Sequence, residues 1–526
     1  MEAALTRIVS GLLIAFFALS VEASGQQLIQ DQRFETELQG SEDHHMTFSL
    51  ESEGLLIVRD NRKFEEGKKI WEITVLDTAL QIVWATRLQT EPDYLLAGYE
   101  YKPKAFHLLF RRDRPDHFHG LVAQLDLARR SFALEPFKIE LSLSLTHYTV
   151  AGGNTILGGT IGNQPTIAIF DQPSRRTNFL PGFFVTDAEL LDIRPNRNNT
   201  FSVIQLRKKP GADELVYGAY DKDGKLLVED RFQVAEGISL LSATSSSLLQ
   251  DEVLIAGTFT YGAIRQSAAA GIFHATIRPF DDNELTYTDF PELDHFLDYL
   301  PEKRSLSIRQ KAEQRKAYGR STDFRLHTAI RRIEEQSGRF LIFGEGWSVP
   351  SGNNTAMQGL PYPGYYRPGY FGYPSFWGAP GMRYGFDPFG PSTAPAQEFR
   401  MLTSFVIAIG TDGKRLWDQS ANLQETRMYS DGQFSDVVIA GDRTGFAFPA
   451  EKGIGTGAAT TGKPGEKFVA IPVSARPEAV SREDDFTDCT IRHWFGQHLY
   501  LSGEQDVAVG GDRKRVFFIN RLHISP

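Results

Sequence analysis

The sequence predicts an all-β fold built from repeated four-stranded units, and three observations support this. A short apolar strand that ends at an aspartate, then turns tightly and returns as a second strand, recurs at Asp77, Asp126, Asp171, Asp221, Asp281 and Asp412. The first intervals between these aspartates are 49, 45, 50 and 60 residues, and the last interval, of 131 residues, contains two insertions. Between them, short runs rich in β-branched and aromatic residues are separated by turn residues. A repeat of about 40 to 50 residues made of several strands predicts a β-propeller with four-stranded antiparallel blades.

The blades can be placed in order along the chain. Residues 46–51, 54–58, 70–77 and 81–88 are the expected strands of the first complete blade. Comparable units follow at about 94–142, 144–184, 186–234, 238–290 and 325–424, and a more weakly patterned unit contains 437–439 and 468–473. Because this seventh unit is weakly patterned, the predicted number of blades is eight, with seven as the alternative.

The C-terminal unit has only three expected strands, at 490–494, 498–501 and 516–519. A three-stranded blade would leave an open edge, which proteins normally cover. Residues 33–38 lie upstream of the first complete blade and have the pattern of a strand. We therefore expect residues 33–38 to supply the fourth strand and to close the ring.

The N-terminal residues predict export. Arg7 precedes an apolar run at 8–21 that is too short to cross a bilayer, and Ala23 ends an acceptable cleavage site. Residues 1–23 are the expected signal peptide, with a buried terminal strand or helix as the alternative, and 24–526 are the expected single propeller domain. No second apolar run follows and no cysteine stands at the new N-terminus, so we expect a periplasmic or extracellular protein without a transmembrane segment or lipid anchor.

Composition argues against two features, a disulfide within the chain and a nucleic-acid partner. Cys489 is the single cysteine, so no disulfide can form within the chain, and stability must come from a large core. The formal charge is −10, and acidic and basic residues are interspersed. Without a basic stripe for a phosphate backbone, the sequence argues against nucleic-acid binding.

The first insertion, residues 291–320, has a helical pattern. Leu293, Phe296, Leu297 and Leu300 recur at spacings of three and four residues before the charged stretch 302–320. We expect a helix packed on the face of the propeller. The alternative is a helix on which a partner docks.

The second insertion, residues 348–398, is rich in proline, glycine and aromatic residues, a composition that disfavours regular structure. Aromatic side chains offer large contact area with few torsions to fix, and a contiguous apolar patch is seldom left exposed without a use. Residues 361–391 are therefore the predicted binding element, with a spacer or a self-packed flap as the alternative. The candidate binding residues are Tyr365, Tyr366, Tyr370, Phe371, Tyr373 and Trp377.

Motifs for catalysis or metal binding are weak, and no catalytic residue, metal ligand or cofactor is predicted. The zinc-protease, nucleotide-cradling and nucleophile-elbow strings are absent from the sequence. Glu345, near a strand end, is a candidate general acid or base, but no second carboxylate can be assigned to it. His117 and His119 would share one face of a strand, beside Asp116, and they are better explained as surface polar residues.

Two further patterns have a structural explanation. Asp221 and Asp223 resemble the opening of a calcium loop, yet a hairpin turn explains this pair and Asp412 equally well. Trp84 and Trp417 fall at matching positions of two blades. They are expected in the core between blades, with ligand stacking as the alternative.

Several local patterns resemble those of uncharacterised secreted propeller-like proteins of Bacteroidota. They are Gly271-Ile-Phe-His274, Gly338 to Glu345, and Phe405 to Trp417, the last of which includes Thr411-Asp412-Gly413. Gly346 stands where a polar residue is more usual in that group. The resemblance covers about half of the chain and implies a secreted propeller without a known activity.

Two functions fit these predictions. The first is a secreted, non-enzymatic propeller that acts as a binding or scaffold module for a protein or glycan partner. The second is an extracellular polysaccharide hydrolase or lyase with its site in the funnel of the propeller. Acidic residues facing one pocket would favour the enzyme, whereas an aromatic rim would favour binding. The sequence leaves the oligomeric state open.

Overall fold

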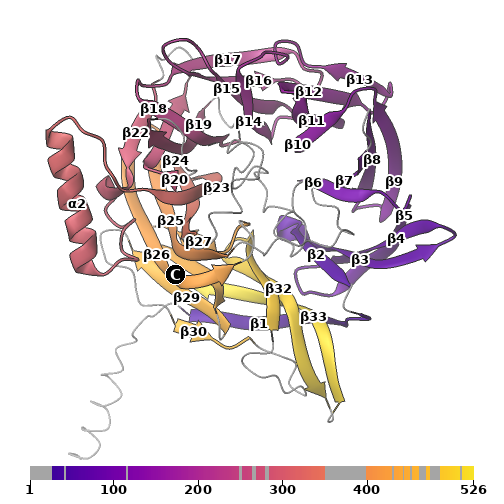
Figure 1. Ribbon diagram of the computed structural model, residues 1–526. Helices are drawn as coiled ribbons and strands as arrows, with labels where there is room; N and C mark the ends of the chain where they lie inside the picture. Colours follow the sequence, from indigo (N-terminus) through magenta and orange to yellow (C-terminus); the bar gives the residue numbers. More distant parts are fainter. Residues whose placement is uncertain are drawn as a thin grey trace, which may run out of the picture.

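The computed structural model describes residues 27–40, 43–113, 117–247, 252–262, 268–278, 284–349, 398–428, 432–441, 443–450, 453–460, 469–473, 486–509 and 512–525. Their strands form eight antiparallel sheets that are arranged as the blades of a ring (Figure 1). The chain is an eight-bladed β-propeller, and the prediction of eight blades is confirmed.

The first four blades each consist of four strands consecutive in the sequence. Blade 1 contains β2 (His44–Ser49), β3 (Leu55–Glu65), β4 (Lys68–Leu76) and β5 (Ile82–Thr90), with the short helix η1 (Glu51–Glu53) between β2 and β3. Blade 2 contains β6 (Leu95–Lys102), β7 (Ala105–Asp113), β8 (Phe118–Asp126) and β9 (Ser131–Ile139). Blade 3 contains β10 (Leu143–Ala151), β11 (Asn154–Ile161), β12 (Gln164–Asp171) and β13 (Arg176–Phe179). Blade 4 contains β14 (Ala188–Pro195), β15 (Phe201–Arg207), β16 (Glu214–Tyr220) and β17 (Leu226–Gln233).

The remaining four blades include the insertions and the closure of the ring. Blade 5 contains β18 (Ile238–Ser245), β19 (Val253–Tyr261), β21 (Gly271–Ile277) and β22 (Thr286–Asp289). Blade 6 contains β20 (Ala268–Ala269), β23 (Leu326–Gln336), β24 (Arg339–Ser348), β25 (Phe399–Gly410) and β26 (Arg415–Met428). Blade 7 contains β27 (Asp436–Ala440), β28 (Arg443–Ala450), β29 (Gly453–Thr460) and β30 (Val469–Ile471). Blade 8 contains β31 (Phe486–Phe495), β32 (His498–Val509), β33 (Asp512–Ser525) and the N-terminal β1 (Gln27–Glu37).

The recurring aspartates stabilise the hairpin turn between the third and fourth strands of a blade. Asp77 Oδ1 accepts hydrogen bonds from the N–H groups of Ala79 and Gln81, each at 2.9 Å. Asp221 and Asp412 accept N–H bonds from the residues that follow them in the same way. An aspartate that bonds its own backbone two residues on favours a tight turn. The repeated aspartate pattern in the sequence therefore reflects the same local turn, which occurs once in each of several blades.

The ring is closed by β1, as predicted. This strand pairs with β33 along its length, with Phe34 opposite Ile519. The Arg33 guanidinium extends across β33, donates to Asn520 Oδ1 at 3.1 Å and to Gln505 Oε1 at 2.8 Å, and lies over the ring of Phe518. The N-terminal strand β1 therefore stabilises the C-terminal blade.

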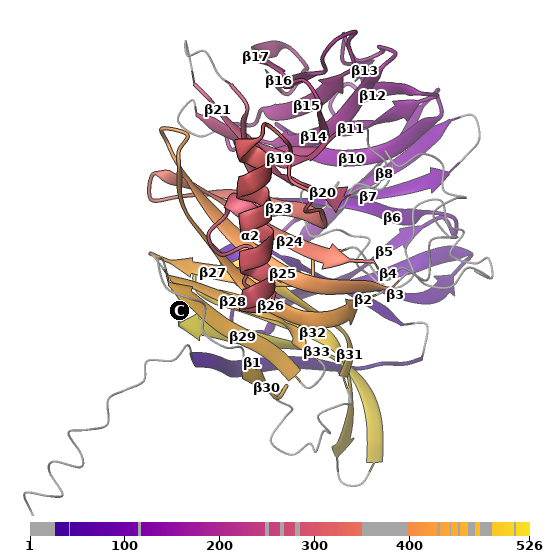
Figure 2. The same ribbon diagram turned by 60° about the vertical axis from the view of Figure 1, so that its left-hand side comes forward.

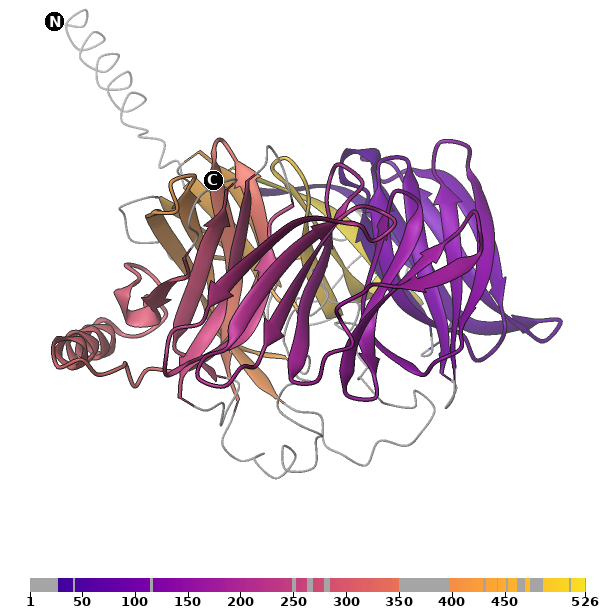
Figure 3. The ribbon, with the colours of Figure 1, turned by 90° about the horizontal axis from the view of Figure 1, so that it is seen from above.

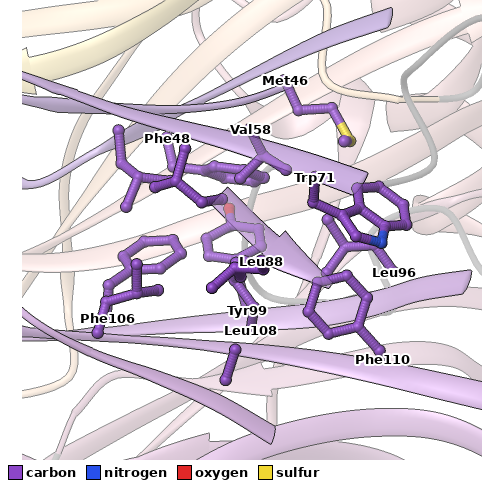
Figure 4. Packing of buried hydrophobic residues seen from close by; sticks show 14 of the residues in the cluster. Met46, Phe48, Val58, Trp71, Leu88, Leu96, Tyr99, Phe106, Leu108 and Phe110 are labelled. Carbon is purple, nitrogen blue, oxygen red and sulfur yellow. The ribbon is translucent and has the colours of Figure 1, made fainter. Parts of the chain in front are cut away.

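Hydrophobic clusters fill the interfaces between neighbouring blades. Between blades 1 and 2, Trp71 lies 5.0 Å from Phe110 and Phe48 lies 4.4 Å from Tyr99, measured between ring centroids (Figure 4). Trp84 packs against this cluster, and Trp417 packs against the equivalent cluster between blades 6 and 7. Both tryptophans are half-buried core residues, as expected. Burial of this apolar surface is the main force that holds the blades in a ring.

The first insertion contains one helix, but its position differs from the predicted one. The helix α2 (Glu302–Ala317) lies outside the ring and has no buried side chain (Figures 2 and 3). The apolar residues that suggested a helix, including Leu293 and Phe296, precede it in η2 (Phe290–Glu292) and the turns that follow. Leu293, Phe296 and Leu297 are fully buried against blades 5 and 6, and Leu300 is partly buried there.

Long-range hydrogen bonds explain why this apolar segment is not helical. The carboxylate of Asp418 on β26 accepts the N–H groups of Asp294 and His295 at 2.9 and 2.7 Å. Ser420 Oγ donates to the carbonyl oxygen of His295 at 2.6 Å. These bonds satisfy backbone groups that a helix would have paired internally. Within the described part of the chain, no helix is long and apolar enough to cross a membrane.

Candidate functional site

The strongest concentration of buried charge lies where blades 6, 7 and 8 meet. We call it the arginine junction, and it consists of the buried Arg331 and the half-buried Arg332 on β23, Glu345 on β24, Asp436 on β27 and Arg492 on β31. Apart from the short β20 and the N-terminal β1, the strands β23, β27 and β31 are the first of their blades in the sequence. Buried charges are costly unless they are paired and hydrogen-bonded, so each of these side chains needs a physical explanation.

A bulge in β23 places two consecutive arginines at this junction. The pairing of β23 with β24 shifts register between Ile330 and Arg332, so that Arg331 is the extra residue. The first strands of blades 2 to 5 show the same register shift, and the extra residues there are Ala97, Thr146, Leu191 and Leu241. A bulge redirects side chains locally. Blade 6 uses this common feature to bury a guanidinium where other blades place smaller or apolar groups.

Glu345 holds the chain that leads into blade 7. Its carboxylate has no exposed surface and accepts the N–H groups of Phe434 and Ser435, the Ser435 hydroxyl at 2.6 Å, and Arg331 Nε at 2.8 Å. Arg331 also donates to the carbonyl oxygen of Gly432 at 2.9 Å. The carboxylate proposed from the sequence as a general acid or base is therefore fully engaged in positioning residues 432–435. This arrangement suits a structural anchor.

Asp436 links blade 6 to blade 8. Its carboxylate pairs with Arg332 and accepts the N–H of His493 at 2.7 Å and Gln433 Nε2 at 2.9 Å. Burial alone would raise the pKa of Asp436, but the neighbouring Arg332 guanidinium and the bond from His493 outweigh it and lower this pKa. The carboxylate is thus ionised, and one acidic side chain joins strands from three blades.

Arg492 is the exception in the junction. Its guanidinium is 7% exposed and donates to two main-chain carbonyl oxygens, those of Gln433 and Ile491, each at 2.7 Å. Burial lowers its pKa, although nearby Tyr500, Asp436 and Glu345 act in the opposite direction. The two other arginines each contact a carboxylate, whereas Arg492 makes no ion pair within the described residues.

The second insertion leaves the ring beside the arginine junction. Its two ends are Trp347 on β24 and Phe399 on β25, which are buried in one cluster with Phe434. The Arg331 guanidinium lies 5.7 Å from the centroid of the Trp347 ring, which also stacks on His327. The candidate binding residues, Tyr365, Tyr366, Tyr370, Phe371, Tyr373 and Trp377, lie outside the described residues. The predicted signal peptide also lies outside them.

The histidine patterns do not form a metal site in the described part of the chain. His117 and His119 share one side of the start of β8, with ring centroids 5.8 Å apart, and Asp116 lies outside the described residues. No group of three histidine, cysteine, aspartate or glutamate side chains among the described residues could hold a metal ion. His45 instead stacks on Phe517 at 4.3 Å, in the interface between blades 1 and 8.

The calcium-like pair lies in a hairpin turn. Asp221 Oδ1 accepts the N–H groups of Asp223 and Lys225, and Asp223 Oδ1 receives Asn154 Nδ2 at 3.2 Å and Lys222 Nζ at 2.7 Å. These carboxylates therefore bond to the turn itself and to blade 3. The interpretation as an aspartate-glycine turn is supported.

Sequence reasoning found Glu345 but missed its partners. A signal for two of them was present, because Arg331 and Arg332 lie between the apolar residues Ile330 and Ile333. Asp436 and Arg492 gave no comparable signal, since each lies in a short segment of mixed polarity. What joins the residues is contact between blades, and that contact depends on the closed ring.

The fold and the arginine junction define an eight-bladed β-propeller with a charged, buried interface between its last three blades. No protein-family model matches the chain, and no curated protein matches it. Among solved structures it is similar to the polysaccharide lyase Uly1, with 8% identity over 93% of this chain and 99% of that chain, at a TM-score of 0.39.

Two other similar structures are a second polysaccharide lyase and a prolyl oligopeptidase. An ulvan lyase of family PL25 is 9% identical over 81% of this chain and 93% of that chain, at a TM-score of 0.38. Prolyl oligopeptidase B from Galerina marginata is 8% identical over 88% of this chain and 56% of that chain, also at a TM-score of 0.38. Likenesses at these scores carry no argument about activity. The resemblance to Bacteroidota proteins remains a prediction.

Proposed function

We propose that the chain is an exported, non-enzymatic propeller that binds a protein or glycan partner through residues 361–391. The observation that carries this proposal is the anchoring of the insertion that contains them. Trp347 and Phe399, at its two ends, are 3% and 9% exposed and pack together with Phe434. A segment rich in aromatic residues thus leaves the ring from a fixed point. Binding loops held by a rigid scaffold are a common arrangement in proteins.

The composition of the insertion supports binding as its role. Tyrosine and tryptophan combine a large apolar face with a polar group, and few torsions need to be fixed when they bind. The planar faces suit stacking on sugar rings or on a partner's prolines. The Glu345 carboxylate, bonded to Arg331 and to backbone N–H groups, is committed to holding the neighbouring chain in place. This commitment supports a scaffold role for the junction.

The decisive experiment changes the aromatic residues and leaves the base of the insertion intact. One variant replaces 361–391 with a Gly-Ser linker, and a second replaces the six candidate aromatic residues with serine at constant length. Binding to a glycan array and to proteins of an envelope extract is compared with that of the parent. We expect both variants to stay folded and to lose binding. If the serine variant binds everything that the parent binds, the aromatic residues are not the recognition element.

The enzyme alternative is tested with the same proteins. Purified parent protein is incubated with acidic and neutral polysaccharides, and new reducing ends and new unsaturated ends are measured over time. We expect neither product to form. Turnover above that of a heat-treated sample would overturn the non-enzymatic assignment. N-terminal sequencing of the protein recovered from its native compartment tests export, with cleavage expected after Ala23.

A further inference from the structure

Arg492 has a physical property that its structural environment does not explain. It is 7% exposed, and two of its N–H donors bond to the carbonyl oxygens of Gln433 and Ile491. In the part of the chain that the structure describes, no carboxylate oxygen lies within 4.0 Å of its nitrogens. A buried cation is normally paired, because neutral carbonyl groups only partly replace its hydration.

The rest of the junction does not supply the missing charge. Glu345 bonds Arg331, and Asp436 bonds Arg332, so each buried carboxylate already has its own guanidinium. Arg332 is only half-buried, with 19% of its side chain exposed, so Arg331 and Arg492 are the two buried guanidinium groups of the junction. The acid Glu334 also contacts Arg332, but its side chain is 44% exposed and it does not reach Arg492. Among the described residues, Arg492 is therefore the buried guanidinium of the junction that has no carboxylate partner.

We propose that the arginine junction is a binding site for the carboxylate group of a small monoanionic ligand, with Arg492 as its cationic partner. A guanidinium offers parallel N–H donors that match the two oxygens of a carboxylate. The charges of Asp436 and Glu345, which lie close enough to influence Arg492, disfavour a doubly charged phosphate. A ligand with a single negative charge meets less repulsion from them.

A buried aromatic side chain lies beside Arg492. Tyr500 lies directly opposite Arg492 on the neighbouring strand, is 2% exposed, and donates its hydroxyl to the carbonyl oxygen of Thr47 at 3.2 Å. Trp494, two residues along β31, is equally buried. A charge-assisted pair formed next to such apolar surface is stronger than one in water, since the local dielectric is lower. The site lies apart from the proposed aromatic recognition element and does not depend on it.

The carboxylate could come from an acidic sugar or from a peptide, and the test separates these sources. Isothermal titration calorimetry at constant ionic strength compares glucuronate and N-acetylglycine with glucuronamide, the uncharged amide of the same sugar. We expect one or both carboxylates to bind the parent at least about tenfold more tightly than glucuronamide, as expected for a charge-assisted pair. The stronger of the two identifies the source. If neither carboxylate binds better than glucuronamide, the proposal is wrong.

Variants assign the binding to Arg492. Arg492→Lys keeps the charge but loses the fork and should weaken carboxylate binding about tenfold, and Arg492→Met should abolish it. Arg427→Gln removes an exposed arginine of β26 as the matched control and should bind as the parent does. Equal binding by Arg492→Lys and the parent would overturn the assignment. If Arg492→Met does not fold, the comparison of carboxylate binding between Arg492→Lys and the parent still tests the assignment.

One further variant separates this proposal from the proposed function. The protein in which a Gly-Ser linker replaces 361–391 should bind carboxylate as the parent does. Loss of carboxylate binding in that variant would place the site in the insertion and overturn the role of Arg492. Each proposal can thus fail without the other.

Discussion

Glu345→Ala is the perturbation that most directly tests the arginine junction. The substitution removes a carboxylate with no exposed surface, and with it the acceptor for Arg331, the Ser435 hydroxyl and two backbone N–H groups. Arg331, whose side chain is 3% exposed, would remain as a buried cation without its ion-pair partner. The chain at 432–435 would also lose its main attachment to blade 6.

The expected cost follows from the burial of this pair. Removing one member of a buried ion pair typically costs about 3–5 kcal/mol, because the remaining charge is left uncompensated. Unfolding entropy is about 2.1 cal/mol/K per residue near 60 °C, which for this chain of 526 residues amounts to about 1.1 kcal/mol/K if the ring unfolds as one unit. The melting temperature should therefore fall by about 3–5 °C.

Calorimetry and a double-mutant cycle separate the ion pair from the other bonds. Arg331→Met is made alone and together with Glu345→Ala, and the free energy of unfolding is measured for all four proteins. Because the double variant has no stranded charge, it should be more stable than the sum of the single effects predicts, by roughly 1–3 kcal/mol. Glu236→Ala, at an exposed loop position, is the matched control and should change stability by less than about 0.5 kcal/mol.

Two outcomes would refute this reasoning. If Glu345→Ala melts within about 1 °C of the parent, the carboxylate does not hold the junction as its bonds indicate. If the cycle shows additive effects, Glu345 and Arg331 do not interact in solution, and the loss would belong to the bonds with 432–435 instead.

Three further predictions concern closure, pH and local sterics. Deleting residues 24–40 removes β1 and should lower the melting temperature by several degrees, because blade 8 loses its fourth strand; an unchanged value in calorimetry would contradict closure by β1. Burial lowers the pKa of His107 from 6.5 to about 4, so the unfolded chain binds the proton more readily than the folded chain does. The free energy of unfolding should therefore fall by on the order of 3 kcal/mol as the pH falls from about 6.5 to 4. His107→Gln should flatten that slope in urea titrations across this pH range whereas the exposed His44→Gln should keep it, and equal slopes would refute the assignment. Gly54 has φ 125°, and a Cβ there would lie 1.8 Å from the carbonyl oxygen of Leu76. Gly54→Ala should therefore lower the free energy of unfolding by about 2–4 kcal/mol, and an unchanged urea midpoint would contradict this.

Local chemistry explains why the repeat could be recognised from the sequence. The turn at Asp77 depends on bonds to Ala79 and Gln81, residues two and four positions away, so any blade that uses it repeats the same short pattern. Strand alternation is equally local, because successive side chains point to opposite faces of a strand. Closure by residues 33–38 also followed, since the unpaired edge of the last blade required a partner and these residues were the unassigned strand.

The helical insertion shows where local reasoning is insufficient. The spacing of Leu293, Phe296 and Leu297 fits a helix, yet the structure places these residues in short turns before α2. The spacing of these residues indicates that their side chains are buried together, but it does not determine the backbone conformation. The backbone conformation was decided by Asp418, more than a hundred residues away, which accepts the N–H groups of this segment.

The sequence alone determined the repeating unit and the strand that closes the ring, because each depends on contacts within a hairpin or on an unpaired edge. It left the number of blades at eight or seven, and the structure decided for eight. The arginine junction was decided by the tertiary structure alone. Arg331, Glu345, Asp436 and Arg492 come from three blades and are as much as 161 residues apart in the sequence. Their charges can be buried only where closure of the ring brings these blades together, and no local pattern encodes the position of a side chain on another blade.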